Sequence, residues 1–418
     1  MHFIAVLIAL LLLPSMCSAA TIEITDSRAT PEYWISRNAD GDKVLITSDK
    51  IAKLNAQIQS KDKNSVDLAS LPKIISADKV NAAIKMTEGD NYNSAHKAVM
   101  DLPVRYAVTT KRGNIRLLPQ SWNGDNYDDF QGTAIDPAEA VAVFCDNPDG
   151  NFVFIQSRNY FGWLEKSDIA FTDRKTWLSY VKPQNFLVVT DNKKLIEVGG
   201  QSLLFQMGAL IPMVNSKVQN DMWVARLPVS VKGQLKEVEV KIAKSDKAVN
   251  KGFLPCTENN FIRQSFKFLG DEYGWGGLND SVDCSAFVQD IYRSMGINIP
   301  RDTDPQKSCM PIWAVFNNVT NAERWDIVSR APIGSMLHKR GHVMMKLGND
   351  DEGRPLVIHA ASSYLDDGNK VYIRKVIVSD LHYKGNADET IDVLTDIVFY
   401  VDASPRINAG DSNYHINR

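Results

Sequence analysis

Residues 273–295 read YGWGGLNDSVDCSAFVQDIYRSM, a glycine-rich polar loop followed by apolar residues at helical spacing. The spacing from Phe287 to Met295 predicts a helix that ends before Gly296. Cys284 therefore lies in the first turn of that helix, where unpaired backbone N–H groups and the helix dipole favour an anion. We expect the pKa of its thiol to be lowered and the thiolate to act as a nucleophile.

A nucleophilic thiol needs a base, and the base needs a third group that orients it. His342 precedes an apolar run at residues 343–347, and His359 follows another at residues 356–358. If these strands pair antiparallel, His342 can face Cys284 with His359 behind it, which is a papain-like arrangement. The alternative is a cysteine that only fills space and two histidines that are satisfied within a core.

The region around these residues changes from helical to strand-like spacing. Helical spacing occupies residues 259–269, whereas strand-like runs begin after Pro332. These runs lie at residues 343–347, 356–358, 371–373 and 397–401. Helices followed by a sheet predict an α+β domain over residues 253–418.

The middle of the chain has short alternating runs separated by turn clusters such as Asn147-Pro148-Asp149-Gly150. The runs lie at residues 104–108, 141–143, 152–154, 162–164, 186–189, 223–225 and 238–241. This punctuation predicts small all-β barrels. We place one barrel at residues 99–180 and a second at 181–252, with the joint at residues 180–183.

The segment before the barrels, residues 21–98, is polar and mixed. Short helical pieces are expected at residues 51–58 and 80–84. We interpret the segment as a mostly helical or irregular arm that packs on the domains after it.

The first twenty residues differ from the rest of the chain. Residues 3–13 form an unbroken apolar run, and Pro14 and small residues come after it, which predicts an export signal over residues 1–20 with cleavage after Ala20. Eleven apolar residues are too few for a spanning helix, which needs roughly 20. We expect export to the periplasm or the medium and no membrane span.

Charge and cysteine content exclude several functions. The formal net charge is −3, from 47 Lys and Arg against 50 Asp and Glu, which gives no electrostatic footprint for nucleic acid or an anionic membrane. Four cysteines come after the export signal, and at least one is expected to be a free thiol. No metal-binding motif occurs, so we expect a protein that works without a metal or another cofactor. We also expect it to be a monomer.

Five motifs in order resemble the NlpC/p60 family of cell-wall cysteine peptidases over residues 253–400. They are Tyr273-Gly274-Trp275-Gly276-Gly277, Asp283-Cys284-Ser285, Ile299-Pro300-Arg301-Asp302 with Gln306, Gly341-His342-Val343 with Leu347-Gly348, and Ile358-His359-Ala360. The resemblance implies hydrolysis of the amide between γ-D-glutamate and the diamino acid in peptidoglycan stem peptides or muropeptide fragments. It also implies that Cys284 is the nucleophile, His342 the base and His359 its orienting partner.

The resemblance also implies a set of substrate-binding residues. Tyr273 would help to hold the oxyanion, and Asp283 and Ser285 would lie at the amino end of the substrate. Trp275 would border the cleft or pack under the glycine turn. Arg301 belongs to the same substrate-binding set.

The upstream region resembles the bacterial SH3-like domains that precede this peptidase in one branch of the family. The likeness lies in residues 116–119, 129–131 and 162–164, and the first 98 residues resemble a stabilising segment more loosely. In that branch the first barrel narrows the peptidase cleft, which favours short or free-ended peptides. The resemblance thus predicts a multidomain chain in which two SH3-like barrels precede a papain-like α+β peptidase domain.

The sequence departs from the family pattern at two places, and it leaves other functions open. Ala286 replaces the usual glycine, and the link between the histidines is long, with a surface turn at residues 349–353. The sequence also permits a non-catalytic peptidoglycan-binding protein, or an amidase or acyltransferase that uses the same thiol. We interpret His338-Lys339-Arg340, just before the base, as a solvated loop.

Overall fold

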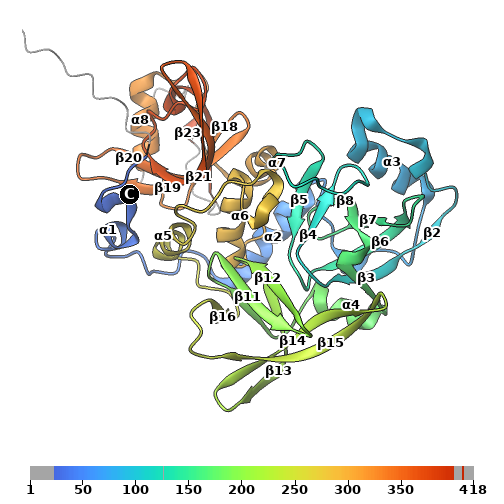
Figure 1. Ribbon diagram of the computed structural model, residues 1–418. Helices are drawn as coiled ribbons and strands as arrows, with labels where there is room; N and C mark the ends of the chain where they lie inside the picture. Colours follow the sequence, from blue (N-terminus) through green and yellow to red (C-terminus); the bar gives the residue numbers. More distant parts are fainter. Residues whose placement is uncertain (1–22, 126, 400–406, 409–418) are drawn as a thin grey trace, which may run out of the picture.

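The computed structural model describes residues 23–125, 127–399 and 407–408 (Figure 1). The predicted export signal at residues 1–20 lies outside the described residues. Figure 1 shows a C-terminal domain in orange and red at one end and a β-rich middle in green, with the N-terminal helices in blue against both. Within the described residues, no helix is long and apolar enough to cross a bilayer.

The C-terminal domain has the predicted order of helices followed by a sheet. Its helices are α5 (Glu258–Phe266), α6 (Cys284–Ser294), α7 (Thr303–Cys309), α8 (Asn321–Arg330) and α9 (Thr390–Val393). Its strands are β17 (Ile312–Val315), β18 (Met336–Lys339), β19 (His342–Asn349), β20 (Pro355–Asp366), β21 (Asn369–Ser379), β22 (Leu394–Val398) and β23 (Ile407–Asn408). Across the described residues these strands form one sheet in the order β21-β20-β19-β18-β22-β17-β23. The predicted strand at 397–401 ends at Val398 as β22, and residues 400 and 401 lie outside the described residues.

Helix α6 forms where the apolar spacing predicted it, and it begins at Cys284. Asp283 caps its N-terminus by accepting a hydrogen bond from the Ala286 N–H at 2.8 Å. Phe287 and Ile291 are fully buried in the core that α6 shares with β19 and β20. The cap and the apolar face together fix the position of the first turn, which presents Cys284.

The β-rich middle forms two sets of strands. The first set is β2 (Leu102–Pro103), β3 (Arg105–Thr109), β4 (Gly113–Arg116), β5 (Gln131–Ile135), β6 (Ala140–Asp146), β7 (Phe152–Gln156), β8 (Phe161–Glu165) and β9 (Ile169–Thr172). The second set is β10 (Phe186–Val189), β11 (Lys193–Val198), β12 (Gln201–Gln206), β13 (Leu210–Gln219), β14 (Met222–Val231), β15 (Gln234–Ala243) and β16 (Val249–Lys251). All of these strands except β2, β11 and β12 share one sheet. A parallel pair between β15 and β9, at Gln234 and Phe171, joins the two sets.

The predicted joint between the sets contains a helix that the sequence did not reveal. Helix α4 (Arg174–Val181) occupies this place, and Asp173 caps it. Trp177 in this helix is fully buried and donates a hydrogen bond to the Val141 carbonyl at 3.0 Å. The helix therefore belongs to the first set of strands and closes its end.

The N-terminal segment contains α1 (Pro31–Ile35), α2 (Ser48–Lys61), α3 (Ala77–Glu88), short 3₁₀ turns and the two-residue strand β1 (Ile74–Ile75). Helix α2 contacts the C-terminal domain, since the Asn55 side chain bonds the Gly296 carbonyl and the Asn298 N–H. Helix α3 contacts the first set of strands, since Glu88 accepts a bond from the buried Trp163 indole. One segment therefore contacts both of the larger units.

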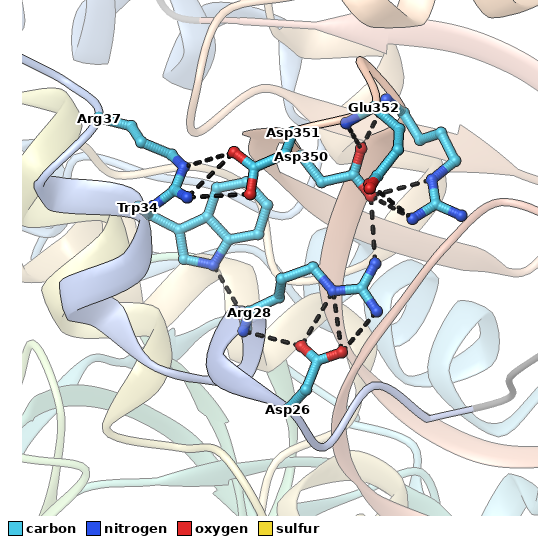
Figure 2. A network of polar contacts seen from close by, with 8 residues as sticks. Asp26, Arg28, Trp34, Arg37, Asp350, Asp351 and Glu352 are labelled. Atoms are coloured by element: carbon cyan, nitrogen blue, oxygen red, sulfur yellow. Dashed lines mark hydrogen bonds and ion pairs between the residues drawn. The ribbon is translucent and has the colours of Figure 1, made fainter.

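We call residues 23–37 the N-terminal clamp, because they pack on the turn between β19 and β20 (Figure 2). Arg28 bonds Asp350 at 3.1 Å, and Arg37 bonds Asp351 at 3.0 Å. The buried Trp34 ring lies against Gly348, where an added Cβ would come within 3.1 Å of it. The clamp therefore holds the far end of the hairpin whose strands carry His342 and His359.

Candidate active site

Cys284 occupies the first turn of α6, as predicted, and is 6% exposed. The backbone of Val343, at the start of β19, lies close enough to the sulfur to lower the pKa of the thiol. The Thr303 hydroxyl lies 4.0 Å from the sulfur. Because Val343 follows His342 directly, this contact brings the thiol to the end of β19 where the predicted base lies.

His342 and His359 meet across the β19–β20 pair. Nε2 of His342 lies 2.8 Å from Nδ1 of His359, and Nε2 of His359 lies 3.1 Å from the Ser379 hydroxyl. If each imidazole donates from Nε2, both contacts are hydrogen bonds and Nδ1 of His342 keeps its lone pair. The pairing thus prepares His342 Nδ1 to accept a proton.

Burial keeps both imidazoles neutral. It lowers the pKa of His342, to which the neighbouring His359 and Lys339 contribute further. It also lowers the pKa of His359 to about 3, with the Lys339 charge as the second cause. Neutral imidazole is the form that a general base requires.

The expected lowering of the Cys284 pKa is wrong. Burial, and after it the Asp283 carboxylate, raises the pKa of this thiol to about 11. The bonds from Val343 and Thr303 act in the opposite direction, but they do not offset the loss of water around a buried sulfur. The resting thiol of Cys284 and the imidazole of His342 are therefore both neutral.

Asp283, Ser285 and Arg301 form a buried polar group below the thiol. The Arg301 guanidinium bonds Asp283 at 2.6 Å and the Ser285 hydroxyl at 2.8 Å. Its Nε donates to Thr133, on β5, at 2.7 Å. Burial raises the pKa of Asp283, but the Arg301 charge outweighs it and the net pKa is lowered, so the carboxylate is ionised. Arg301 therefore connects the β-rich middle to the cap of the helix that carries Cys284.

The glycine-rich loop lies between α6 and the first set of strands. The Gly276 carbonyl accepts a bond from Gln131 at 3.0 Å, and its N–H donates to Asp283 at 3.0 Å. Gly276 has φ +59°, and a Cβ there would come within 2.5 Å of the Gln131 side chain, so only glycine suits this position. The loop is therefore tied both to β5 and to the helix cap.

Tyr273 and Trp275 lie on this loop in different environments. Burial raises the pKa of Tyr273, which also interacts electrostatically with Cys284, so its hydroxyl stays protonated and can donate. Trp275 is 39% exposed and faces the Tyr127 ring at 5.3 Å between centroids. Of the two places expected for Trp275, the structure has the exposed one, at the boundary with the β-rich middle.

The predicted solvated loop at His338-Lys339-Arg340 is also wrong in part. His338 and Lys339 lie in β18 and are 1% and 8% exposed, while Arg340 is exposed. The turn is shorter than expected, because Lys339 pairs directly with His342 and only Arg340 and Gly341 join the two strands. The sequence pattern thus did not reveal Lys339, although a glycine just before a predicted strand was a signal for a tight turn.

The other cysteines and any metal-binding groups also bear on the chemistry of the site. Cys145, Cys284 and Cys309 are free thiols, and the last two of them are buried. Among the residues that the structure describes, no cluster of three His, Cys, Asp or Glu side chains could hold a metal ion. The arrangement that remains is a buried thiol, a histidine pair and a capped helix end.

Comparisons with known proteins agree with this geometry. Residues 270–376 match the family model of the NlpC/P60 family, and residues 119–165 match that of an SH3 domain of the SH3b1 type. A γ-D-glutamyl-L-lysine dipeptidyl-peptidase from Bacillus cereus (strain ATCC 10987 / NRS 248) is 24% identical over 241 residues, which cover 55% of this chain and 62% of that relative. The match thus spans less than two thirds of the relative's length.

Two solved structures are similar. An NlpC/P60 endopeptidase from Photobacterium damselae subsp. piscicida has a TM-score of 0.67 and 15% identity, covering 86% of this chain and 91% of that one. An NlpC/P60 family protein from Bacillus cereus ATCC 10987 has a TM-score of 0.49 and 17% identity, covering 71% and 99%. The first likeness shows a shared fold. The chain therefore contains an NlpC/P60 domain, with an SH3b1-type SH3 domain ahead of it.

Proposed function

We propose that this protein is an exported cell-wall hydrolase that cleaves the γ-D-glutamyl–diamino acid amide of peptidoglycan stem peptides. One observation carries the proposal: the Val343 backbone, which acts on the Cys284 thiol, directly follows His342, and His342 is itself paired with His359. The name of the Bacillus cereus relative supports the choice of bond. The proposed roles are nucleophile for Cys284, base for His342 and orienting partner for His359.

The proposed reaction begins from the neutral pair. The Cys284 thiol gives its proton to His342 Nδ1 as the sulfur attacks the carbonyl carbon of the scissile amide. Tyr273 and the unpaired N–H groups at the start of α6 donate to the oxygen that becomes negative. The imidazolium then protonates the departing amine, the C–N bond breaks, and a thioester remains on Cys284. Water, deprotonated by His342, hydrolyses that thioester and restores the thiol.

The second histidine, His359, orients the imidazole of His342. The bond to His359 fixes the ring and the position of its proton, and the Ser379 hydroxyl in turn holds His359. A proton that arrives at Nδ1 gives the ring a charge that His359 Nδ1 can stabilise by accepting a stronger hydrogen bond. We therefore place His359 as an orienting and stabilising group.

The proposed substrate path runs between the peptidase domain and the first barrel. Asp283 and Ser285 face the amino end of the substrate, Arg301 holds them, and the exposed Trp275 borders the entrance beside Tyr127. We assign residues 21–98 to a stabilising segment, 99–180 and 181–252 to SH3-like barrels, and 253–418 to the peptidase. Barrels of this kind suit binding to peptidoglycan fragments, and the barrel beside the entrance favours short peptides.

The test is product analysis with purified muropeptides and mass spectrometry. Cys284→Ala should abolish release of the diamino acid fragment and leave the circular dichroism spectrum unchanged. Cys309→Ala, which removes another buried thiol of the same domain, is the matched control and should remain active. Full activity of the Cys284→Ala protein would refute the assignment.

The same products separate the other functions. Release of an intact stem peptide from the sugar would indicate an amidase, and a product joined to an added amine would indicate an acyltransferase. Binding to muropeptides without any product would indicate a non-catalytic peptidoglycan-binding protein.

A further inference from the structure

A buried lysine lies beside the proposed catalytic pair. Lys339 is directly opposite His342 in the β18–β19 register, and it is 8% exposed. Its ammonium lies 5.8 Å from the centre of the Tyr383 ring, and that ring packs edge-on against His359 at 5.0 Å. Lys339, His342 and His359 thus share one face of the sheet at the proposed centre of reaction.

The ammonium is poorly satisfied for a buried charge. Within the described residues, its hydrogen bond is to the Thr390 hydroxyl at 3.3 Å, and no carboxylate forms an ion pair with it. Burial lowers its pKa to about 8, and the interaction with Cys284 acts in the opposite direction. A buried cation normally has an anion or several oxygen acceptors around it, and among the described residues Lys339 has no anionic partner.

A second buried lysine shows what a satisfied one looks like. Lys346, on the neighbouring strand β19, is 2% exposed. Its ammonium donates to the carbonyls of Ser329 and Ala331 at 2.8 and 2.9 Å. Two backbone acceptors explain Lys346 as a structural group, whereas Lys339 has only one neutral hydroxyl.

Gly385 lies close to the Lys339 ammonium. It is half-buried in the loop between β21 and α9, and its φ lies outside the left-handed region, so the backbone does not require glycine there. A Cβ at this position would come within 2.9 Å of the Lys339 Nζ. The absence of a side chain therefore lets the loop approach the ammonium without a clash.

We propose that Lys339 is a substrate-binding residue whose ammonium takes a carboxylate next to the scissile amide. The inference rests on the proposed function, because a γ-linked glutamyl residue keeps its α-carboxylate free, with the Cα, Cβ and Cγ atoms between it and the reacting carbonyl. The departing amino acid offers a second carboxylate, one carbon from the nitrogen that His342 protonates. Either carboxylate could meet the ammonium, and substrates in which one or the other is amidated tell them apart.

A bound carboxylate would also change the chemistry of the site. It removes the repulsion between the Lys339 charge and the imidazolium that forms on His342. A substrate with the carboxylate therefore helps to create the charged intermediate, whereas a neutral analogue leaves the repulsion in place. Recognition should consequently appear in kcat as well as in KM.

The experiment compares three tripeptides, L-alanyl-γ-D-glutamyl-diamino acid and two of its amides, built on whichever diamino acid the wild type cleaves in muropeptides. One amide blocks the departing residue's α-carboxylate, and the other converts the glutamyl residue to isoglutamine. We expect wild-type kcat/KM to fall by about 10- to 100-fold for one amide, the size of a lost charge-assisted hydrogen bond. The amide that is affected identifies the carboxylate.

Lys339→Met should abolish this preference, so that the free tripeptide and its amide are cleaved at nearly equal rates. Lys339→Arg should retain part of it. Gly385→Ala, which places a methyl group against the ammonium, should lower the preference without removing the charge. Lys346→Met is the matched control: it should lower the melting temperature and leave the ratio of rates as in the wild type.

The outcomes distinguish failure of the Lys339 assignment from failure of the proposed function. Equal loss on all three tripeptides in Lys339→Met would overturn the carboxylate assignment and leave Lys339 as a structural residue, with the proposed function intact. A wild type that prefers neither free carboxylate would overturn it too. If the wild type cleaves no γ-D-glutamyl substrate at all, the proposed function fails and this inference fails with it.

Discussion

Two regions use arginine–aspartate pairs to hold the peptidase domain, and they differ in burial. Arg301 joins β5 to the helix that carries Cys284, with side chains 5% and 9% exposed in its pair with Asp283. The N-terminal clamp holds the far end of the β19–β20 hairpin, where Arg37 and Asp351 are 41% and 64% exposed (Figure 2). The chemistry is the same, but only the first pair is away from water.

The difference shows that the contribution of an ion pair to stability is best judged by the effect of removing one of its two charges. A buried pair gains little over an apolar replacement, yet removal of one partner leaves an uncompensated charge. An exposed pair is screened by water and salt in both states. The clamp should therefore depend on Trp34, and the helix cap should depend on Arg301.

Arg301→Met should have the largest effect. It leaves the ionised Asp283 buried without its cation, at a cost of about 3–5 kcal/mol in the free energy of unfolding, measured with urea. The wild-type contribution is present above the unfolded pKa of the carboxyl, and it is lost as pH falls through the lowered folded pKa of Asp283.

The double variant Asp283→Asn, Arg301→Met supplies the control, because it removes both charges. It should be more stable than Arg301→Met alone. A loss below about 1 kcal/mol in the single variant would show that the buried pair is no more important than an exposed one.

Trp34→Ala should have the next largest effect. The ring is 3% exposed, packs on Gly348 and donates to the Arg28 carbonyl at 2.8 Å. Its removal should cost about 3 kcal/mol in a thermal or urea unfolding experiment. Met86→Ala, at a 61% exposed position of the same N-terminal segment, should change stability little, and an equal loss in both would contradict a packing role.

The rate of Cys284 alkylation reports the protonation state of this buried thiol. A thiol with a pKa of about 11 holds about 100-fold less thiolate at neutral pH than one with the ordinary value of 9.0, although that thiolate is more nucleophilic. We expect iodoacetamide to react about 10-fold more slowly than with a model thiol at pH 7, with a rate that still rises above pH 9. A rate that is already maximal at pH 7 would indicate a thiolate at rest.

Asp351→Asn should have the smallest effect. The substitution removes the exposed ion pair but keeps the stacking of Arg37 on Tyr33, whose ring centre is 3.6 Å away. The change in stability should be below about 0.5 kcal/mol and should vanish in 1 M salt. A larger loss would mean that the polar contacts, and not Trp34, hold the clamp.

Local patterns predicted a large part of the fold. The helix at Cys284, the strands after His342 and before His359, and the short strands of the middle follow from spacing and turn residues, which are properties of neighbouring residues. Helix α4 was missed because its eight residues come after strand-like runs and their burial depends on contacts such as Trp177 with Val141. The tandem sets were predicted as separate barrels, whereas the β15–β9 pair that joins them is a contact between distant residues.

The residues proposed for the site came from the sequence, whereas the direction of the Cys284 pKa shift predicted from it was wrong. Spacing and resemblance named Cys284, His342 and His359, and a helix N-terminus alone predicts a lowered thiol pKa. Burial reverses that direction, and burial is fixed by everything that packs around the sulfur. Lys339 was taken for a solvated residue because three polar residues in a row hide a two-residue turn.

The sequence by itself named the proposed nucleophile, its proposed histidine partners and the family resemblance, because each depends on residue type and on spacing along the chain. The tertiary structure decided the neutral resting state of the thiol, the buried connection through Arg301 and the place of Lys339 beside the base. These depend on strand register and on exclusion of water, which arise only when segments far apart in the chain pack together.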